Sequence, residues 1–314
     1  MSASWVAGTV RARALARRRL GAGGARALAA RLTLTAAVEA LADTPYGHDV
    51  HPGQGLAEAE HAVGAALLWN LRVLAGWLPR DGAAVLRMLA GWFELANLDD
   101  RIAELEGTAP AEPAYALGAL AASASRIAAA GSPAALADVL ARPPWRVRDV
   151  GVAGDVRVAA RLGWAEAVLT TVPEAVPWVR GATVLALLAD LAAAGHLATA
   201  GSEGRIARIL GPGVLPALRA GAGDLARARS ALPRDARWVI EGIDDPGELW
   251  RGEVAWWRRV ERDGFTLLAG TGFGRRPVVG ATAVLAADAR RVRAALETAA
   301  DGTAAAREAF DDVA

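Results

Sequence analysis

Apolar and polar residues alternate with the period of an amphipathic helix in residues 86–105. Four apolar residues share one face at helical spacing: Leu95, Leu98, Ile102 and Leu105. Four polar residues share another: Glu94, Asn97, Arg101 and Glu104. This pattern predicts a single long helix with a continuous apolar stripe that packs against several neighbours.

In the segments before this stretch, prolines and a loop separate further predicted helices. A short helix is predicted from Ala37 and is stopped by Pro45. A loop is expected at residues 47–55, followed by a long helix over residues 56–78 that Pro79 ends. The chain is therefore predicted to be helical throughout.

Parts of this layout recur along the chain. Leu41-Ala-Asp-Thr-Pro-Tyr46 is similar to Leu140-Ala-Arg-Pro-Pro-Trp145, and Leu95-Ala-Asn-Leu98 to Leu188-Ala-Asp-Leu191. A Gly-Ala-Thr triplet at Gly181 returns 99 residues later at Gly280. A repeat of this length is not a solenoid period. It predicts three similar helical domains of about a hundred residues each.

The domain boundaries are expected where Pro and Gly gather. These places are the Pro- and Ala-rich residues 108–113 and the triplet Gly211-Pro-Gly213. The predicted domains are residues 1–112, 113–212 and 213–314, which fits a chain too long for one ordinary core.

Composition supports an all-α fold and excludes several kinds of site. Apolar residues make up 54% of the chain, mostly Ala, Leu and Val, and the 35 basic residues are all Arg; Ala, Leu and Arg favour helices. The complete lack of Lys is typical of a GC-rich genome. A net charge of +1 offers no strong field to nucleic acid. Since Cys is absent, disulfides and thiolate metal sites are excluded.

No apolar run reaches about 18 residues without a charge, so no transmembrane helix is predicted. The most apolar candidate, residues 181–195, is short and is interrupted by Asp190. We therefore expect the chain to be soluble on its own.

The N-terminal segment is basic, because seven arginines precede Glu39, the first acidic residue: Arg11, Arg13, Arg17, Arg18, Arg19, Arg26 and Arg31. Three interpretations stay open. The segment could be an organelle transit peptide, although Ser and Thr are scarce. It could be a helix facing an acidic partner or an anionic lipid surface, or an ordinary helix with a solvated basic face. Arg11, Arg13 and Arg17 are candidate partner contacts.

Two groups of residues could suggest ligand binding. His48 and His51, with His61 further on, have a spacing that suits no standard metal site, and no metal is predicted there. The glycine-rich residues 21–24 and 270–274 lack the strand-then-helix setting of a nucleotide-binding loop, so they are interpreted as turns.

The acids on the 86–105 stretch raise the possibility of an enzyme. Asp99, Asp100 and Glu104 form a DDxxxE pattern, which all-α isoprenoid synthases use to hold Mg²⁺. Such an enzyme also needs a second metal-binding helix, and neither Asn70 nor Asn97 heads one. No metal-dependent chemistry is predicted. Two structural roles stay open for the acids: bridging to neighbouring helices or simple solvation.

The tryptophans fall into two groups. Seven lie in apolar helical patterns and are predicted to be core: Trp5, Trp69, Trp77, Trp92, Trp164, Trp178 and Trp238. A second set lies among arginines, a composition that favours protein interfaces: Trp250, Trp256, Trp257, Arg258 and Arg259. Interleaved acids such as Glu253 argue against a nucleic-acid groove here.

Four stretches, in order, resemble the C/d subunit family of rotary V-type and archaeal-type ATPases. They are the Arg-rich stretch from Val10 to Leu20, the turn Leu41-Ala-Asp-Thr-Pro-Tyr46, the helix Trp92-Phe-Glu-Leu-Ala-Asn-Leu98, and the closing segment, Trp256 to Phe265 followed by Phe273 to Pro277. Asp288 to Arg293 echoes the family's helix signature. The family's acid-x-x-Asn-Leu signature matches Glu94, Asn97 and Leu98, and Asp288 echoes its acid. Arg291 replaces the expected Asn, and Leu187 replaces the acid in the middle copy, as in a divergent bacterial branch.

The resemblance implies three helical domains in a funnel or triangle, with no active site and no cofactor. It implies a rotor adaptor that joins the central-stalk subunits to the membrane ring of ion-carrying subunits. Such a subunit is cytoplasmic and lies on the inner face of the membrane through its partners. It binds neither nucleic acid nor a small-molecule substrate.

Overall fold

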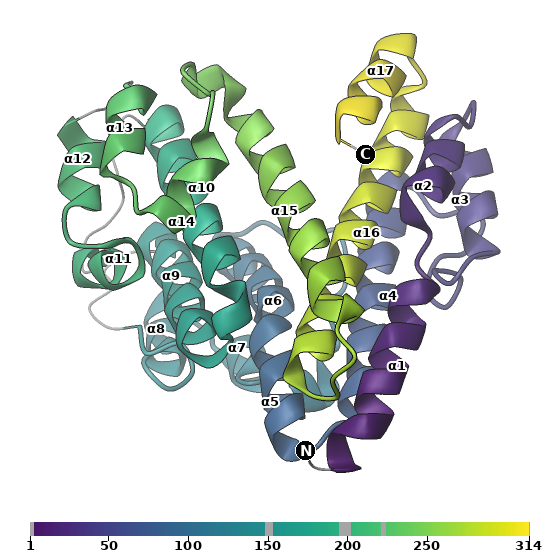
Figure 1. Cartoon of the computed structure of the whole chain (residues 1–314), viewed down its shortest axis with the longest axis horizontal. Coiled ribbons are helices and arrows are strands. Elements are labelled where there is room, and N and C mark those ends of the chain that lie inside the picture. The colour runs from purple at the N-terminus through teal and green to yellow at the C-terminus, as the bar shows by residue number, and fades with distance from the viewer. Residues whose placement is uncertain (1–2, 148–152, 195–201, 221–223, 314) are drawn as a thin grey trace. The chain divides into compact units, whose positions relative to one another are not determined.

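The computed structural model describes residues 3–147, 153–194, 202–220 and 224–313. Every regular element in these ranges is a helix (Figure 1), which confirms the all-α prediction. The proposed grouping into three domains arranged as a funnel stays a prediction.

The longer helices are, in chain order, α1 Val6–Arg17, α2 Gly21–Ala29, α3 Leu34–Ala42, α4 Leu56–Ala75, α5 Arg80–Leu89, α6 Gly91–Leu105, α7 Ala124–Ala129, α8 Pro133–Leu140, α9 Ala153–Thr171, α10 Val176–Ala194, α11 Glu203–Leu210, α12 Val214–Ala220, α13 Leu225–Ala231, α14 Arg234–Arg237, α15 Leu249–Ala269, α16 Arg275–Asp301 and α17 Ala304–Val313. Short 3₁₀ turns lie between some of them: η1 Ala3–Trp5, η2 Gly118–Leu120, η3 Pro173–Ala175, η4 Trp238–Ile240 and η5 Pro246–Glu248.

The chain forms two compact units. Unit 1 joins three segments, Met1–Ala90, Pro110–Leu120 and Val260–Ala314. Unit 2 consists of Gly91–Ala109 and Ala121–Arg259. Unit 1 therefore contains segments from both ends of the chain, and α15 contributes its first part to unit 2 and its second part to unit 1.

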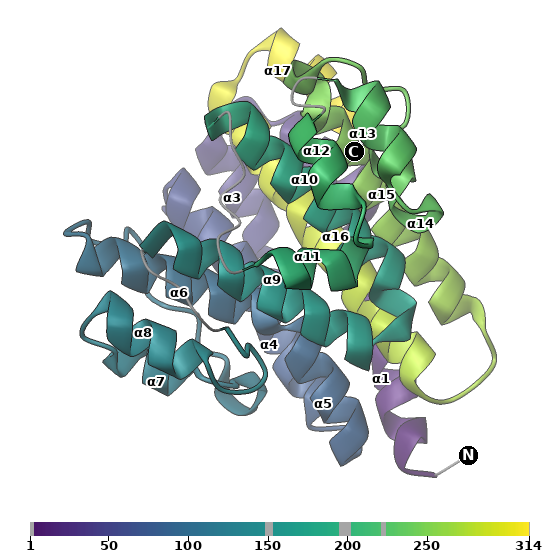
Figure 2. The same cartoon turned by 90° about the vertical axis from the view of Figure 1, so that its left-hand side faces the viewer.

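Helix α16 is the centre of unit 1. It packs against α1, α2, α3, α4 and α5, and the yellow ribbon of α16 runs beside the purple helices near the N-terminus (Figures 1 and 2). Nineteen of its residues are buried, among them Val278, Val284, Leu296 and Asp288. A helix that is buried nearly all round is typical of a core. It ends at Gly302, whose φ of 71° is the left-handed conformation that glycine adopts without strain.

The crossing of α15 and α16 requires glycine. A Cβ atom added at Gly280 would lie 2.6 Å from the carbonyl oxygen of Gly264 and 2.9 Å from Cβ of Leu267. These distances are shorter than van der Waals contact, so the two backbones approach closely only because no side chain separates them.

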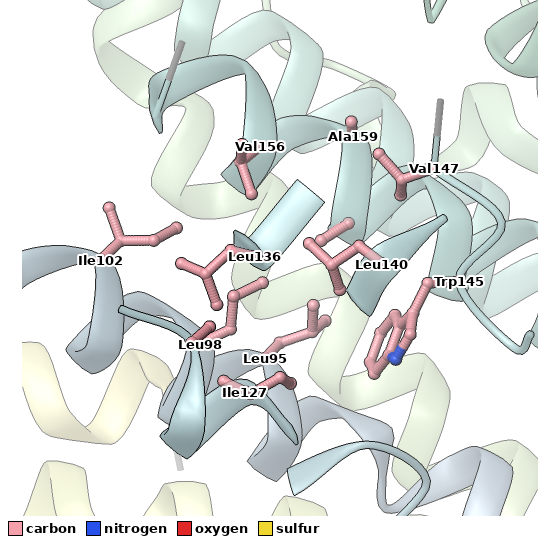
Figure 3. Close-up of a cluster of buried hydrophobic side chains, with 12 residues drawn as sticks. Leu95, Leu98, Ile102, Ile127, Leu136, Leu140, Trp145, Val147, Val156 and Ala159 are labelled. Carbon is pink, nitrogen blue, oxygen red and sulfur yellow. The ribbon is translucent and has the colours of Figure 1, made fainter. Parts of the chain in front are cut away.

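In unit 2 the predicted apolar stripe of α6 is confirmed. Leu95, Leu98 and Ile102 are buried and pack with Ile127, Leu136, Leu140 and Trp145 from α7, α8 and the turn that follows α8 (Figure 3). Val156 and Ala159 of α9 complete this cluster, which we call the α6 core. Leu105, the last residue of the stripe, is only partly buried against it.

The prediction of one helix over residues 86–105 is wrong. Helix α5 ends at Leu89, and α6 begins at Gly91 in the other unit. The amide of Ala90 still bonds to the Leu86 carbonyl at 2.8 Å, which closes α5. A Cβ at Gly91 would lie 2.5 Å from Nε1 of Trp164, so the glycine at the break leaves room for this indole.

The repeated sequence landmarks occupy matching local settings. Helices α3 and α8 are each followed by a turn that buries an aromatic side chain, Tyr46 in one and Trp145 in the other. In the Gly-Ala-Thr copies, each buried threonine hydroxyl donates to the carbonyl four residues earlier, at 2.8 Å from Thr183 and 3.0 Å from Thr282. Each glycine faces a close neighbour, which for Gly181 is the ring of Trp238 at 2.9 Å from the added Cβ.

The prediction that seven tryptophans are core holds for one of them. Trp178 is buried, but Trp77 is 54% exposed. The most deeply buried indole belongs to Trp145, at 1% exposure. Apolar spacing predicted which residues lie on helices, but it did not predict which tryptophans the helices enclose.

Among the described residues, one helical segment is long and apolar enough to cross a membrane, Pro173–Ala192. It starts eight residues before the apolar run noted in the sequence, whose end at Gly195 lies outside the described residues. About 44% of its most apolar part is buried inside the fold, and core helices of soluble proteins have the same composition.

Candidate functional site

The carboxylate of Asp288 holds together three segments of unit 1. It is fully buried on α16. Its Oδ2 accepts the Leu20 amide at 2.9 Å and the Tyr46 hydroxyl at 2.9 Å, and its Oδ1 accepts the Gly21 amide at 2.7 Å. Helix α2 begins at Gly21 without a side-chain cap of its own. Asp288 therefore supplies the acceptor that the free amides at this helix start need.

Two neighbours complete the Asp288 site. Burial and the adjacent Asp288 carboxylate raise the pKa of Tyr46 well above its ordinary value, so its hydroxyl stays a donor. One turn along α16, Arg291 forms a two-pronged ion pair with Glu261 at 2.6 and 3.1 Å. This ion pair ties α16 to α15.

Glu94 plays the same part in unit 2. It is 1% exposed on α6 and accepts the backbone amides of Ala122, at 3.1 Å, and Ser123 at the start of α7. The hydroxyl of Ser123 in turn accepts the indole Nε1 of Trp145 at 3.3 Å. Burial raises the pKa of Glu94, while the two amides and the nearby Arg126 act against that rise.

The four residues of the predicted helix signature, Glu94, Asn97, Leu98 and Asp288, are all buried. Glu94 and Asp288 bridge to a neighbouring helix, Asn97 is 9% exposed and Leu98 is 1% exposed. Of the two roles left open for the acids, Glu94 has the bridging one. The face of α6 that carries Glu94 and Asn97 was expected to be polar, yet both residues are buried.

The acids of the DDxxxE pattern are engaged with arginines. Asp99 pairs with Arg161 of α9 at 2.5 Å and with Arg157 at 3.8 Å, and Glu104 pairs with Arg101 at 2.5 Å. Burial raises the pKa of Asp99 despite these partners. Asp99 thus bridges α6 to α9 while its side chain stays 32% exposed, and Asp100 also makes a contact. Within the described ranges, no three His, Asp or Glu side chains are grouped so that they could hold a metal ion.

The three predicted contact arginines of α1 differ in their surroundings. Arg13 donates to the backbone carbonyls of Gly270 and Gly272 and lies over the ring of Phe273, so it holds the α15–α16 loop. Arg17 is exposed and has no ion pair within the described part of the chain. Arg11 is half-buried, and its Nε is enclosed without a hydrogen-bond partner there.

Arg11 lines a cavity of about 230 Å³ in unit 1, which we call the arginine pocket. Its lining comes from α1, the turn after α3, α4 and α16: Arg11, Leu15, Arg18, Arg19, Thr44, Pro45, Tyr46, His48, Leu67, Trp69, Asn70, Leu285 and Asp288. Three guanidinium groups thus surround a cavity whose only carboxylate is Asp288.

One wall of the arginine pocket is flat. The rings of His48 and Trp69 stack with centroids 4.4 Å apart and planes tilted by 27°. His48 is held in place by Asp49, whose Oδ2 lies 2.8 Å from Nδ1. Arg19 lies over Phe265 at 4.6 Å and donates to the Ala16 carbonyl. Arg11 and Arg18 have no such partner for their guanidinium groups among the residues that the structure describes.

The second predicted contact segment, on α15, is partly used inside unit 2. Trp256 donates its indole N–H to the Trp178 carbonyl at 2.7 Å and meets Trp257 edge to face, and Arg259 lies over Trp238 at 4.6 Å. Trp250 is 49% exposed beneath Arg251. Arg258 is exposed and also has a contact. Trp250 is therefore the aromatic residue of this segment that offers most surface to a partner.

No family model matches the sequence, and a comparison with curated proteins finds no match.

The arginine pocket was not predicted from the sequence because its lining spans residues 11 to 288. One local signal could have found part of it. Arg11, Leu15 and Arg18 stand four and then three residues apart, which places them on one face of α1.

Proposed function

We propose that this chain is a non-catalytic helical adaptor of a rotary ATPase. In this role it joins the central-stalk subunits to the membrane ring, on the cytoplasmic side. The order of the four family-like stretches motivates the choice of partners. The proposal needs no cofactor and no metal.

The observation that carries the proposal is the use of the signature acids. Asp288 and Glu94 have their carboxylates occupied by backbone amides at the start of α2 and α7. A carboxylate that satisfies buried donors is part of the frame and is not available for catalysis. The acids that an enzyme of the isoprenoid-synthase kind would use, Asp99 and Glu104, are paired with arginines.

An adaptor that transmits torque has to be stiff and has to offer docking surfaces. Densely packed helices deform little, and α16 is enclosed along most of its length. Docking side chains are also available. Arg17 projects from α1 into solvent, and Trp250 with Arg251 forms an exposed aromatic and cationic pair of the kind enriched at interface centres.

The proposal is tested by co-purification from the source cell. The tagged chain is expected to retain stalk and ring subunits, and deletion of its gene is expected to abolish ATP-driven ion pumping in membrane vesicles. Arg17→Glu and Trp250→Ala are expected to weaken retention. Arg234→Glu is the matched control, because Arg234 is equally exposed on α14 and lies outside both predicted contact segments.

One outcome would remove the rotor role, and a second would remove only the predicted docking surfaces. If neither stalk nor ring is retained and pumping survives deletion, the chain is a stand-alone helical scaffold. If Arg17→Glu and the Arg234→Glu control weaken retention equally, the docking depends on net charge and not on the predicted surface at Arg17.

A further inference from the structure

The arginine pocket contains more positive charge than the fold uses. Asp288 is the only carboxylate in its lining and is already saturated by two amides and the Tyr46 hydroxyl. Arg11 and Arg18 pair with no acid among the described residues. With three arginines and one carboxylate in its lining, the cavity has an excess of positive charge, which attracts an anion.

The buried Nε of Arg11 adds a second observation. It is an enclosed donor with no acceptor within the described ranges. Leaving a buried donor unsatisfied is costly, and the cost is greater for a charged group. The Nε of Arg19, which also lines the pocket, is enclosed in the same way, so two of the three guanidinium groups in the lining carry an unsatisfied donor.

We propose that the arginine pocket binds the phosphate monoester group of a compact ligand. A phosphate carries close to two negative charges near neutral pH and three acceptor oxygens, and the planar guanidinium fork matches its geometry. The group would lie between Arg11 and Arg18. The rest of the ligand would lie against the stacked His48 and Trp69 rings.

The cavity limits the size of this ligand. At about 230 Å³ it is smaller than the pockets that hold drug-sized molecules. Apolar side chains, Leu15, Leu67 and Leu285, line part of it. A phosphate ester with a small flat apolar group therefore fits the lining better than free phosphate does. This inference is independent of the rotor role, since either function leaves the pocket in place.

The binding is tested by calorimetry on the whole chain with phenyl phosphate as the probe. We expect saturable binding of one molecule, weaker binding of inorganic phosphate, and weaker binding of benzoate, which has one charge. Arg18→Gln should weaken the binding of phenyl phosphate about tenfold or more, because a charge-assisted hydrogen bond is lost. Arg18 is exposed, so this change is expected to leave folding intact.

The matched control is Arg17→Gln. Arg17 is the neighbouring residue of the same helix, is equally exposed, and does not line the pocket. It removes the same charge and should leave affinity within about twofold. If Arg17→Gln weakens binding as much as Arg18→Gln, the effect is one of net charge and the proposal is wrong.

A second arm separates a soluble ester from a lipid headgroup. Vesicles of phosphatidylcholine with and without phosphatidic acid are tested by co-sedimentation. Binding of phosphatidic acid that depends on Arg18, without binding of phenyl phosphate, assigns the pocket to a lipid phosphate. Binding of phenyl phosphate that depends on Arg18 assigns it to a soluble ester. If neither probe binds, the pocket is not a phosphate site.

Discussion

The Asp288 site of unit 1 and the Glu94 site of unit 2 use one device in two different surroundings. In each, a buried acid on a long helix accepts the first amides of a short helix, and an aromatic side chain from the turn after the following helix completes the network. The Glu94 network is closed by the α6 core. The Asp288 network borders a cavity lined with arginines.

This difference separates the capping acid, which both units use to fix a helix, from the arginines, which only the Asp288 site has. A single acid with its amides is enough to fix α7 on α6, and the arginine close to Glu94, Arg126, is bonded to Ser123. The Asp288 site fixes α2 on α16 in the same way and has the arginines in addition. Because the capping device works without them, Arg11 and Arg18 are best explained by something other than stability.

The largest effect is expected from Asp288→Ala. It leaves the Leu20 and Gly21 amides and the Tyr46 hydroxyl without their acceptor, which should lower the free energy of unfolding by about 4 kcal/mol. Urea unfolding measures this, and hydrogen exchange should show faster exchange in α2. Glu39→Ala, an exposed change on α3, is the control and should stay within about 0.5 kcal/mol. A loss below about 1 kcal/mol for Asp288→Ala would contradict the capping role.

A smaller loss in the free energy of unfolding, about 2 kcal/mol, is expected from Glu94→Ala. Only two amides lose their acceptor, and burial already disfavours the charged form of the Glu94 carboxyl in the folded chain. Glu94→Gln should cost less than Glu94→Ala, since its amide oxygen still accepts one bond and burial already disfavours the charge. Exchange should accelerate at the Ala122 and Ser123 amides and not in α2. Faster exchange in both places would show that the two networks are not separate.

The two Gly-Ala-Thr copies give a third contrast. Gly280→Ala should destabilise by about 3 kcal/mol, because the new Cβ meets backbone at the α15–α16 crossing. Gly181→Ala should cost about 1 kcal/mol, since the rings of Trp238 and Trp256 can shift. Gly270→Ala, with no neighbour within 4 Å, is the control. Equal losses for Gly181 and Gly280 in thermal unfolding would mean that the two crossings are equally rigid.

The smallest effect concerns the carboxylate pair of Glu60 and Glu297 in unit 1. Burial and a hydrogen bond to Glu297 of α16 raise the pKa of Glu60 to about 7, which Arg293 partly opposes. The folded carboxyl thus binds its proton more tightly than the ordinary value of 4.5 allows, so stability is lost as pH rises between these values. Glu60→Gln should therefore be more stable than the natural chain at about pH 8 and similar to it at about pH 5. Urea unfolding at the two pH values checks this, with Glu39→Gln as the control, and equal effects at both would contradict the raised pKa of Glu60.

The sequence predicts the helices and much of the α6 core, because both follow from local spacing. Leu95, Leu98 and Ile102 pack as the period of 3.6 residues requires. The recurrence of Tyr46 and Trp145 after similar helices also had a structural basis. These features depend on residues close together in the chain.

Features that depend on distant residues could not be predicted from spacing. Nothing near Asp288 indicates that its oxygens meet Leu20 and Tyr46, more than 240 residues away. Helical periodicity also placed Glu94 on a polar face, although the start of α7 covers it. Trp77 is exposed for a related reason, since it lies in the turn after α4 and not on a buried helix face.

The composition of unit 1 from both ends of the chain has a consequence for synthesis on the ribosome. Helices α1 to α4 are made more than 200 residues before α16, the helix they enclose. Contacts of such long range form slowly, because a long loop must close before they contribute. Unit 2 can fold before α16, the central helix of unit 1, has been synthesised. During that interval the early helices expose the apolar faces that α16 later covers, which makes them natural clients for a chaperone.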